Sequence, residues 1–280
     1  MTDPPGDPAT GRGPTPRALI VTVYGLYARD AGGFLPVAAL IRLLDELGVD
    51  EPAVRSAISR LKRRGLLESR RSGGVAGYAL SEQGREVLRE GDERIFQPPD
   101  VRTSDGWLLA VFSVPETERQ KRHALRSRLA WLGFGTAAPG VWIAPAHRYE
   151  ATAAALRRLG LDPYVTLFRA DHLAFSDLGT AIGTWWDLAE LRRQYADFVT
   201  GYRPVLDRWR ETPTGGREAA AFADWVRALT VWRRLPYLDP GLPADLLPAD
   251  WPGGRAADLF AALRGRLADA AAGFVRTATA

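Results

Sequence analysis

The segment from Val54 to Gly74, VRSAISRLKRRGLLESRRSGG, concentrates positive charge in a pattern that suits contact with phosphate groups. Between residues 55 and 71 it has seven basic side chains and one acidic side chain, whereas the first 100 residues contain 14 of each and the whole chain has a net charge of +4. The charged residues are Arg55, Arg60, Lys62, Arg63, Arg64, Glu68, Arg70 and Arg71. Such a local excess is the electrostatic footprint of a protein that binds a nucleic-acid backbone.

Apolar spacing predicts that much of this charge lies on the outward face of one helix. The buried stripe of that helix is Val54, Ala57, Ile58 and Leu61, at the spacing of one helix face. Asp50 is suited to cap the start of the helix, and Gly65 ends it. The residues that face away from the stripe or flank it are Arg55, Ser56, Ser59, Arg60, Lys62 and Arg63. A helix fits the DNA major groove, and the two serines are small enough to let this helix lie deep in it.

The elements around the basic helix predict a winged helix-turn-helix domain over residues 17–96. A first helix is expected over 17–29, and a second around Leu40 to Leu47, ended by Gly48. After the basic helix, LLESRR and YALS are typical of two strands joined by SGGVAG, and Ser81 can cap a helix that extends to Phe96. In this arrangement Arg70 and Arg71 lie on the wing, where it meets backbone phosphates. The alternatives are a solvated helix face, an RNA-binding domain, or a winged helix that binds another protein.

A linker at 97–106 leads to a middle domain, residues 107–175, in which strand and helix patterns alternate. Strands are expected at 107–114, 140–145 and 164–170, with one helix between each pair and room for a further strand. This order predicts a ferredoxin-like α+β sandwich. The first of these helices, 116–132, has five basic side chains and two glutamates. These charges are typical of a helix face that is exposed to solvent. The alternative is a surface that binds the phosphate groups of DNA or of an anionic ligand.

The ends of the chain differ in character from the middle. Residues 1–16 are rich in proline, glycine, threonine and aspartate, which predicts a disordered tail. Residues 176–280 have long stretches of helical periodicity and six of the nine tryptophans, so a mostly helical C-terminal domain is expected. Large aromatic side chains of this kind build a helical core, and they can also line a pocket for an apolar ligand.

Composition and motifs argue against several other classes of protein. The chain has no cysteine, no apolar run long enough to span a membrane and no secretory signal, so we expect a cytoplasmic protein without disulfides. It has no nucleotide-binding loop and no recognisable nucleophile motif, and His123, His147 and His172 are isolated from one another. We therefore expect no enzymatic activity, no metal site and no cofactor. A metal-dependent nuclease remains the alternative from the class of enzymes.

The chain resembles the PaaX family of repressors of phenylacetic acid catabolism over residues 17–275. The resemblance is carried by VRSAISRLKRRGLL, by WLLAVFSVPETERQKRHALRSRLAWLGFG with APGVWIAP, and by DPGLPADLLPADWPG. It implies a homodimeric winged-helix repressor that binds double-stranded operator DNA of an aromatic-acid operon, and that an aryl-acyl-coenzyme A, usually phenylacetyl-CoA, releases. The middle domain also resembles the small Cas2-type nucleases. The first strand ends in Ser113, Val114 and Pro115 in place of an acidic residue, so this resemblance implies fold and dimerisation rather than cleavage.

An aryl-acyl-CoA effector needs cations for its phosphates and an aromatic platform for its adenine or aryl group. The residues of the middle and C-terminal domains that have this chemistry are Arg122, Arg126, Trp142, Arg148, Trp185 and Arg192. They are selected by chemical type, and the sequence does not show that they lie together.

Overall fold

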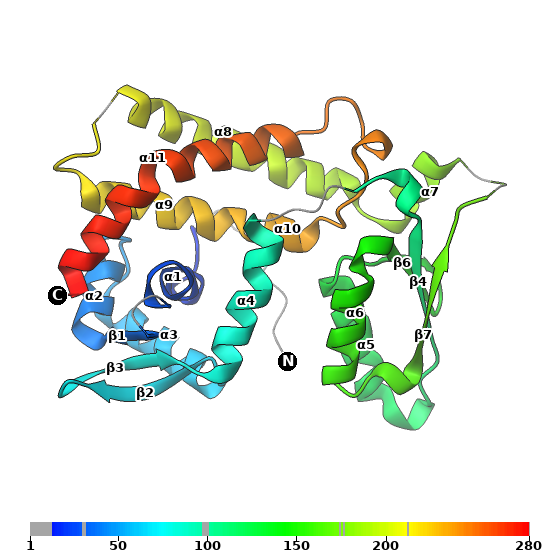
Figure 1. The fold of residues 1–280 in the computed structure, drawn as a ribbon, viewed down its shortest axis with the longest axis horizontal. Coiled ribbons are helices and arrows are strands. Elements are labelled where there is room, and N and C mark those ends of the chain that lie inside the picture. Colours follow the sequence, from blue (N-terminus) through cyan, green and yellow to red (C-terminus); the bar gives the residue numbers. More distant parts are fainter. Residues whose placement is uncertain are drawn as a thin grey trace. The chain divides into compact units, whose positions relative to one another are not determined.

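The computed structural model describes residues 13–29, 32–96, 101–173, 175, 177–211 and 213–279 (Figure 1). These residues form two compact units, each made of stretches that are far apart in the sequence. The sandwich unit contains the described residues from 97 to 195 and from 234 to 252. The winged-helix unit contains those up to 96, from 196 to 233 and from 253 onward. Both units combine helices with a small antiparallel sheet, so the predicted α+β class is confirmed.

The winged-helix unit begins with the predicted helices and hairpin, together with two elements that the sequence did not predict. They are α1 (Pro16–Val23), η1 (Tyr24–Ala28), β1 (Phe34–Pro36), α2 (Val37–Asp45), α3 (Glu51–Arg63), β2 (Leu67–Ser72), β3 (Val75–Leu80) and α4 (Glu82–Phe96). Strand β1 was not predicted, and it pairs with β3 to complete a sheet of order β1-β3-β2. The first helix was predicted as regular from 17 to 29, but its last five residues are a π-helix, η1. The disordered tail was predicted over residues 1–16, of which residues 1–12 lie outside the described residues. Thr15 and Pro16 are described, and they cap and begin α1.

Helices from the C-terminal region complete the core of the winged-helix unit. These are the later residues of α8 (Leu188–Glu211), α9 (Glu218–Trp232) and α11 (Gly253–Thr279). Helix α9 packs against both α11 and α1, and the rings of Trp225 and Trp232 stack on Phe260. Thr230 of α9 donates a hydrogen bond to the buried hydroxyl of Thr22 in α1, at 2.8 Å. The N-terminal helix-turn-helix elements therefore rest on helices that lie more than 100 residues later in the chain.

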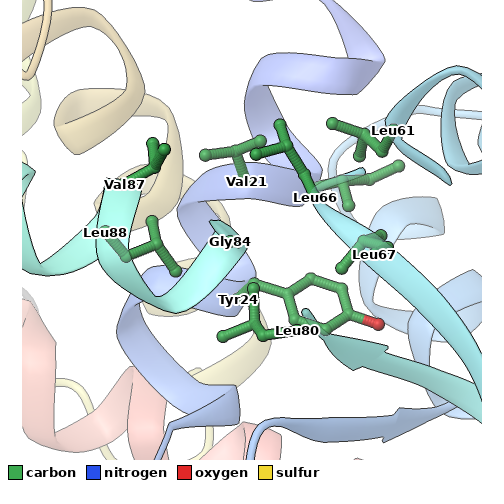
Figure 2. Close-up of a pocket in the computed structure, with 10 residues that line it drawn as sticks. Val21, Tyr24, Leu61, Leu66, Leu67, Leu80, Gly84, Val87 and Leu88 are labelled. Atoms are coloured by element: carbon green, nitrogen blue, oxygen red, sulfur yellow. The ribbon is translucent and has the colours of Figure 1, made fainter. Parts of the chain in front are cut away.

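A small cavity lies where α1 and α4 meet the base of the wing (Figure 2). Its volume is about 20 Å³, which is close to the space of one water molecule and far below that of an aryl group. Val21, Leu66, Val87 and other apolar side chains line it. Gly84 of α4 must be a glycine at this point, because a Cβ there would lie 2.3 Å from the carbonyl oxygen of Leu66. The cavity is therefore a feature of packing in this unit.

The sandwich unit has the ferredoxin-like strand order. Its elements are β4 (Trp107–Phe112), α5 (Arg119–Trp131), β5 (Gly135–Ala138), β6 (Val141–Pro145), α6 (Tyr149–Arg158) and β7 (Val165–Ala170), and the sheet order is β5-β6-β4-β7. Helices α5 and α6 cover one face of this antiparallel sheet through Leu125, Leu129 and Leu156. The other face packs against α7 (Leu178–Trp185) through Ile182 and Trp185. In the region from residue 176 onward, predicted to be mostly helical, the first helix ends before Trp186 and Asp187, which lie between α7 and α8.

Candidate nucleic-acid interface

Helix α3 presents the outward face that the sequence predicts. Asp50 caps it, accepting a 2.8 Å hydrogen bond from the backbone nitrogen of Ala53. The four residues of the predicted stripe are buried, and all six residues predicted to face outward are exposed. Because an α-helix turns about 100° per residue, Ser56, Ser59 and Arg63 lie opposite the stripe, while Arg55, Arg60 and Lys62 flank it. The most outward part of the helix is thus two small serines beside one arginine.

The basic side chains of α3 have local partners that hold them near the helix surface. Arg55 forms an ion pair with Glu51, one turn earlier, at 2.6 Å. Arg60 donates to the hydroxyl of Ser56 at 2.9 Å. Both contacts are exposed, and exposed pairs of this kind stabilise a fold by no more than about 1 kcal/mol. A phosphate or a base edge can therefore replace either partner at little cost.

Lys62 links α3 to the wing. Its ammonium donates to the hydroxyl of Ser69 in β2 at 2.7 Å, and it lies 5.7 Å from the centre of the Tyr78 ring in β3. The backbone carbonyl oxygen of Tyr78 accepts a hydrogen bond from the hydroxyl of Tyr24 in η1, at 3.0 Å. Burial raises the pKa of Tyr24, so this hydroxyl remains a donor over the physiological range. These contacts hold the wing at a defined position relative to the helix.

The wing is the hairpin of β2 and β3, and its outer half is exposed from Glu68 to Ala76. Arg70 pairs with Gly77 and Arg71 with Ala76, so both arginines lie on the protruding part. Because successive strand residues face opposite sides, Arg71 shares a face with Ser69, the partner of Lys62, and Arg70 lies on the other. Gly73 and Gly74 form the tip with φ of 57° and 81°, a conformation that favours glycine.

Two exposed residues at this surface were not singled out as DNA-binding from the sequence. Arg64 is exposed at the end of α3, in the same basic run as Lys62 and Arg63. Val75 is half exposed at the wing tip, directly after the two glycines. Arg64 directly precedes the glycine that ends the helix, and this position could have identified it from the sequence as part of the basic surface. An apolar residue in a glycine-rich turn gives no comparable signal.

The two elements together form one cationic surface with a groove-binding helix beside a narrow hairpin. Only Glu51 and Glu68 among its exposed residues are acidic, and Glu51 is one turn from the outward centre of α3. Winged helix-turn-helix proteins that bind DNA have this arrangement, in which the helix contacts bases and both elements contact phosphates.

Comparison with known families matches this chain from residue 15 to residue 277 in three successive parts. A model described as PaaX-like protein matches residues 15–84, one described as PaaX protein central Cas2-like domain matches 100–182, and one described as PaaX-like protein C-terminal domain matches 186–277. The chain belongs to the PaaX family. The predicted membership is thereby confirmed.

Two known proteins are similar to this PaaX-family chain over most of its length. The curated Transcriptional repressor PaaX of Escherichia coli (strain K12) is 29% identical over 261 residues, which is 92% of this chain and 82% of that protein. A solved structure of an uncharacterized protein from Mycobacterium tuberculosis has a TM-score of 0.58 at 24% identity, covering 94% of this chain and 99% of that one. At this level of identity the solved structure supports the fold alone.

The effector candidates of this PaaX-family chain lie in different parts of the sandwich unit. Trp142 packs in the core under α5 and α6, whereas Trp185 packs against Trp107 on the opposite face of the sheet. The sheet therefore separates the two tryptophans. The cause is the alternation of strand residues: Trp142 and Ile143 are adjacent in β6 and face opposite sides.

The four arginine candidates differ in the hydrogen bonds and ion pairs that they make within the chain. Arg122 bonds to Glu116 and to the carbonyl oxygen of Val114, at 3.0 and 2.6 Å. Arg192 forms a bidentate pair with Asp250, one bond of which measures 2.8 Å. Arg126 is exposed on α5 and makes no hydrogen bond or ion pair with any residue that the structure describes.

Arg148 is the fourth of these arginines, and it has a structural role. It donates to the carbonyl oxygens of Asp239 and Pro240, both at 3.2 Å, and burial lowers its pKa. Asp239 in turn accepts from the hydroxyl of Tyr195 at 2.7 Å and from the backbone nitrogen of Gly241. This network holds the proline-rich segment after α10 (Leu235–Leu238) against the sandwich unit.

Within the described ranges, no three His, Cys, Asp or Glu side chains are grouped so that they could hold a metal ion. The strand β4 is followed by Ser113 and the buried Val114, at the place where Cas2-type nucleases have an acidic residue. None of the helices in the part of the chain that is described is long and apolar enough to cross a membrane.

Proposed function

We propose that this chain is a cytoplasmic transcriptional repressor that binds double-stranded operator DNA as a homodimer, without enzymatic activity. The observation that carries the proposal is the exposed cationic surface of α3 and the wing, in a domain that belongs to the PaaX family. The E. coli relative, a transcriptional repressor, supports it. A homodimer is expected because one helix-turn-helix makes few base contacts, and two-fold dimers bind two half-sites about one DNA turn apart.

The test of this proposal is binding of the full chain to the DNA upstream of its own gene. Because several arginines would displace counterions from phosphates, affinity should fall about 100-fold or more between 50 and 200 mM salt. Fluorescence anisotropy with a labelled upstream fragment and with a shuffled fragment of equal length measures both affinity and specificity. Equal affinity for the two fragments would contradict an operator-binding function. Cleavage of either fragment on addition of a divalent metal would instead support the nuclease alternative.

We further propose that the regulated genes degrade an aromatic acid of the phenylacetate type, and that an aryl-acyl-CoA releases the protein from its operator. The support is the family, together with a sandwich unit that contains far more chain than DNA recognition needs. Of the six candidate effector residues, Arg126 is the cation most available to a CoA phosphate, since Arg122, Arg148 and Arg192 bond within the chain. Trp142 and Trp185 cannot both stack on one aryl ring, because they lie on opposite faces of the sheet.

Phenylacetyl-CoA or a related thioester should dissociate a preformed operator complex. Release requires that the effector bind the DNA-incompetent state more tightly, and reciprocity requires operator DNA to weaken effector binding by the same factor, about 5–150-fold. The measurement is a titration of phenylacetyl-CoA, other aryl-acyl-CoAs, phenylacetate and free CoA into the labelled complex. Phenylacetate should have no effect, because it lacks the phosphates that the cations would bind. Release by phenylacetate at the same concentration as its thioester would refute this mechanism.

A further inference from the structure

Arg55 differs from Arg60, a cation on the same helix, in the kind of partner that it has. Arg60 donates to a neutral hydroxyl group, that of Ser56. Arg55 instead pairs with a carboxylate, that of Glu51, one turn nearer to the start of α3. A negative charge on a surface that should attract phosphate groups opposes the binding of DNA. The position of Glu51 at this surface therefore calls for a physical explanation.

The atoms of the pair show which edge of the Arg55 guanidinium remains available. Its Nε donates to Oε1 of Glu51 at 2.7 Å, and its Nη2 lies 2.6 Å from the same oxygen. A guanidinium is planar, and each of two edges can present a pair of donors to acceptors. Glu51 thus occupies the edge of Nε and Nη2. The edge of Nη1 and Nη2 makes no hydrogen bond with any residue that the structure describes.

The open edge of Arg55 matches the acceptors of guanine. Arginine binds O6 and N7 of guanine with two N–H donors, which is the commonest specific contact in the major groove. Arg55 is in the first half of α3, and the N-terminal residues of such a helix are the ones that contact base edges. Because guanine and Glu51 would use different edges of the guanidinium, the ion pair can persist while Arg55 binds a base.

Glu51 is itself held at a defined place on the helix. It is the first residue of α3, between the capping residue Asp50 and Pro52, whose ring fixes its φ. The side chains of Glu51 and Arg55 are 50% and 58% exposed, so the pair is weak in the absence of DNA. A base contact excludes water from the pair and reduces its screening. The pair should therefore become stronger where Arg55 meets a base.

A guanidinium that is already held loses less conformational freedom on binding than a mobile one. Immobilising a long side chain at an interface lowers affinity by roughly 2–12-fold. An arginine that Glu51 has already ordered does not incur this loss when it binds guanine. Binding to phosphates gains little from such order, because a phosphate attracts the guanidinium in many orientations.

We propose that Glu51 is a positioning residue for base recognition, which holds the Arg55 guanidinium so that its open edge contacts guanine. The carboxylate weakens binding to all DNA by repelling phosphates, and it raises the preference for sequences that have this guanine. The proposal rests on the DNA-binding function proposed above and identifies a residue that increases its specificity. An ion pair that only stabilised the helix, the other role for this spacing, would leave base preference unchanged.

Substitution of Glu51 should change affinity and base preference in opposite directions. Glu51→Ala should raise affinity for a shuffled DNA fragment, because a negative charge is removed. It should lower the ratio of affinities for the upstream and shuffled fragments by roughly 2–12-fold. The matched control is Glu68→Ala, which removes the other exposed acidic side chain of this surface and should leave the ratio unchanged. Fluorescence anisotropy of the full chain with both labelled fragments measures these affinities.

A double-mutant cycle tests whether Glu51 acts through Arg55. Arg55→Ala alone should lower the same ratio by about 5–150-fold. Adding Glu51→Ala to this variant should change the ratio by less than about twofold, because no guanidinium is left to position. Circular dichroism at the temperature of the measurement checks that each variant is folded, and partial unfolding would lower affinity for both fragments alike.

The possible outcomes separate this inference from the proposed function. If the original protein prefers the upstream fragment and Glu51→Ala leaves the ratio unchanged, Glu51 does not position Arg55 and the proposed function stands. The same conclusion follows if Glu51→Ala lowers the ratio equally with and without Arg55, or if Arg55→Ala keeps the original ratio. If the original protein binds both fragments equally, the proposed function and this inference both fail.

Discussion

Arg55→Ala should relax the base preference of the protein at one operator position, whereas Arg71→Ala should weaken its binding to every DNA sequence. Arg55 is exposed on α3, the helix that we expect to enter the major groove, and among the described residues it pairs with the exposed Glu51. Loss of a bidentate contact between arginine and guanine costs about 1–3 kcal/mol, or roughly 5–150-fold in affinity, and the loss is confined to the sequences that have that guanine. Arg71, on the wing, would bind phosphates, which are the same in all sequences.

The two roles give different signatures in salt titration and in selection of binding sites. Arg71→Ala should reduce the slope of log affinity against log salt by about 1, with the same preferred sequence. The same measurements on Ser59→Ala and Arg60→Ala extend the test to the other residues that we expect to contact bases, and Arg70→Ala extends it to the second arginine of the wing. Arg210→Ala, in α8 and paired with Asp207, is the control and should leave both properties unchanged. Identical base preferences and identical salt slopes for the Arg55 and Arg71 variants would contradict this division.

The exposed cationic surface of α3 and the wing could be predicted from the sequence because its residues are contiguous. One helix and the hairpin after it contain nearly all of its charge, and the stripe from Val54 to Leu61 determines which side of the helix faces outward. Preferences of neighbouring residues for helix caps and turns are sufficient to predict such a short segment. The Asp50 cap and the glycine tip of the wing are two examples. Strand β1 was missed because three residues, Phe34 to Pro36, are too few to show an alternating pattern.

The effector candidates could not be placed in the same way. Their arrangement depends on which face of the sheet each strand residue occupies and on contacts between distant segments. Arg148 illustrates the second cause, because its partners Asp239 and Pro240 lie about 90 residues later in the chain. This side chain, selected by chemical type as a cation for a ligand, is partly buried and supports a proline-rich segment. The predicted domain boundaries, 17–96, 107–175 and 176–280, remain predictions, and the compact units are assembled from non-adjacent stretches.

The dependence of the winged-helix unit on distant helices leads to the prediction with the largest effect on stability. Trp225→Ala should lower the free energy of unfolding of this unit by about 3–5 kcal/mol. Trp225 is 2% exposed, and its ring stacks on Phe260 of α11 at a centroid distance of 5.5 Å. It lies in α9, which also packs against α1. The alanine leaves a cavity at this junction, and the loss is a large part of the 5–15 kcal/mol that stabilises a typical domain.

This change should affect DNA binding without touching any DNA-binding residue. Helix α1 packs against α3 as well as α9, so loss of the α9 contact should destabilise the support of α3. The midpoint of urea unfolding, followed by circular dichroism, should fall, and operator affinity should be near normal in the cold but lost on warming. Trp225→Phe keeps a ring in the same place and should lose much less. A loss below about 1 kcal/mol for Trp225→Ala, or operator binding that survives global unfolding of α9 and α11, would show that the N-terminal elements fold independently of the C-terminal helices.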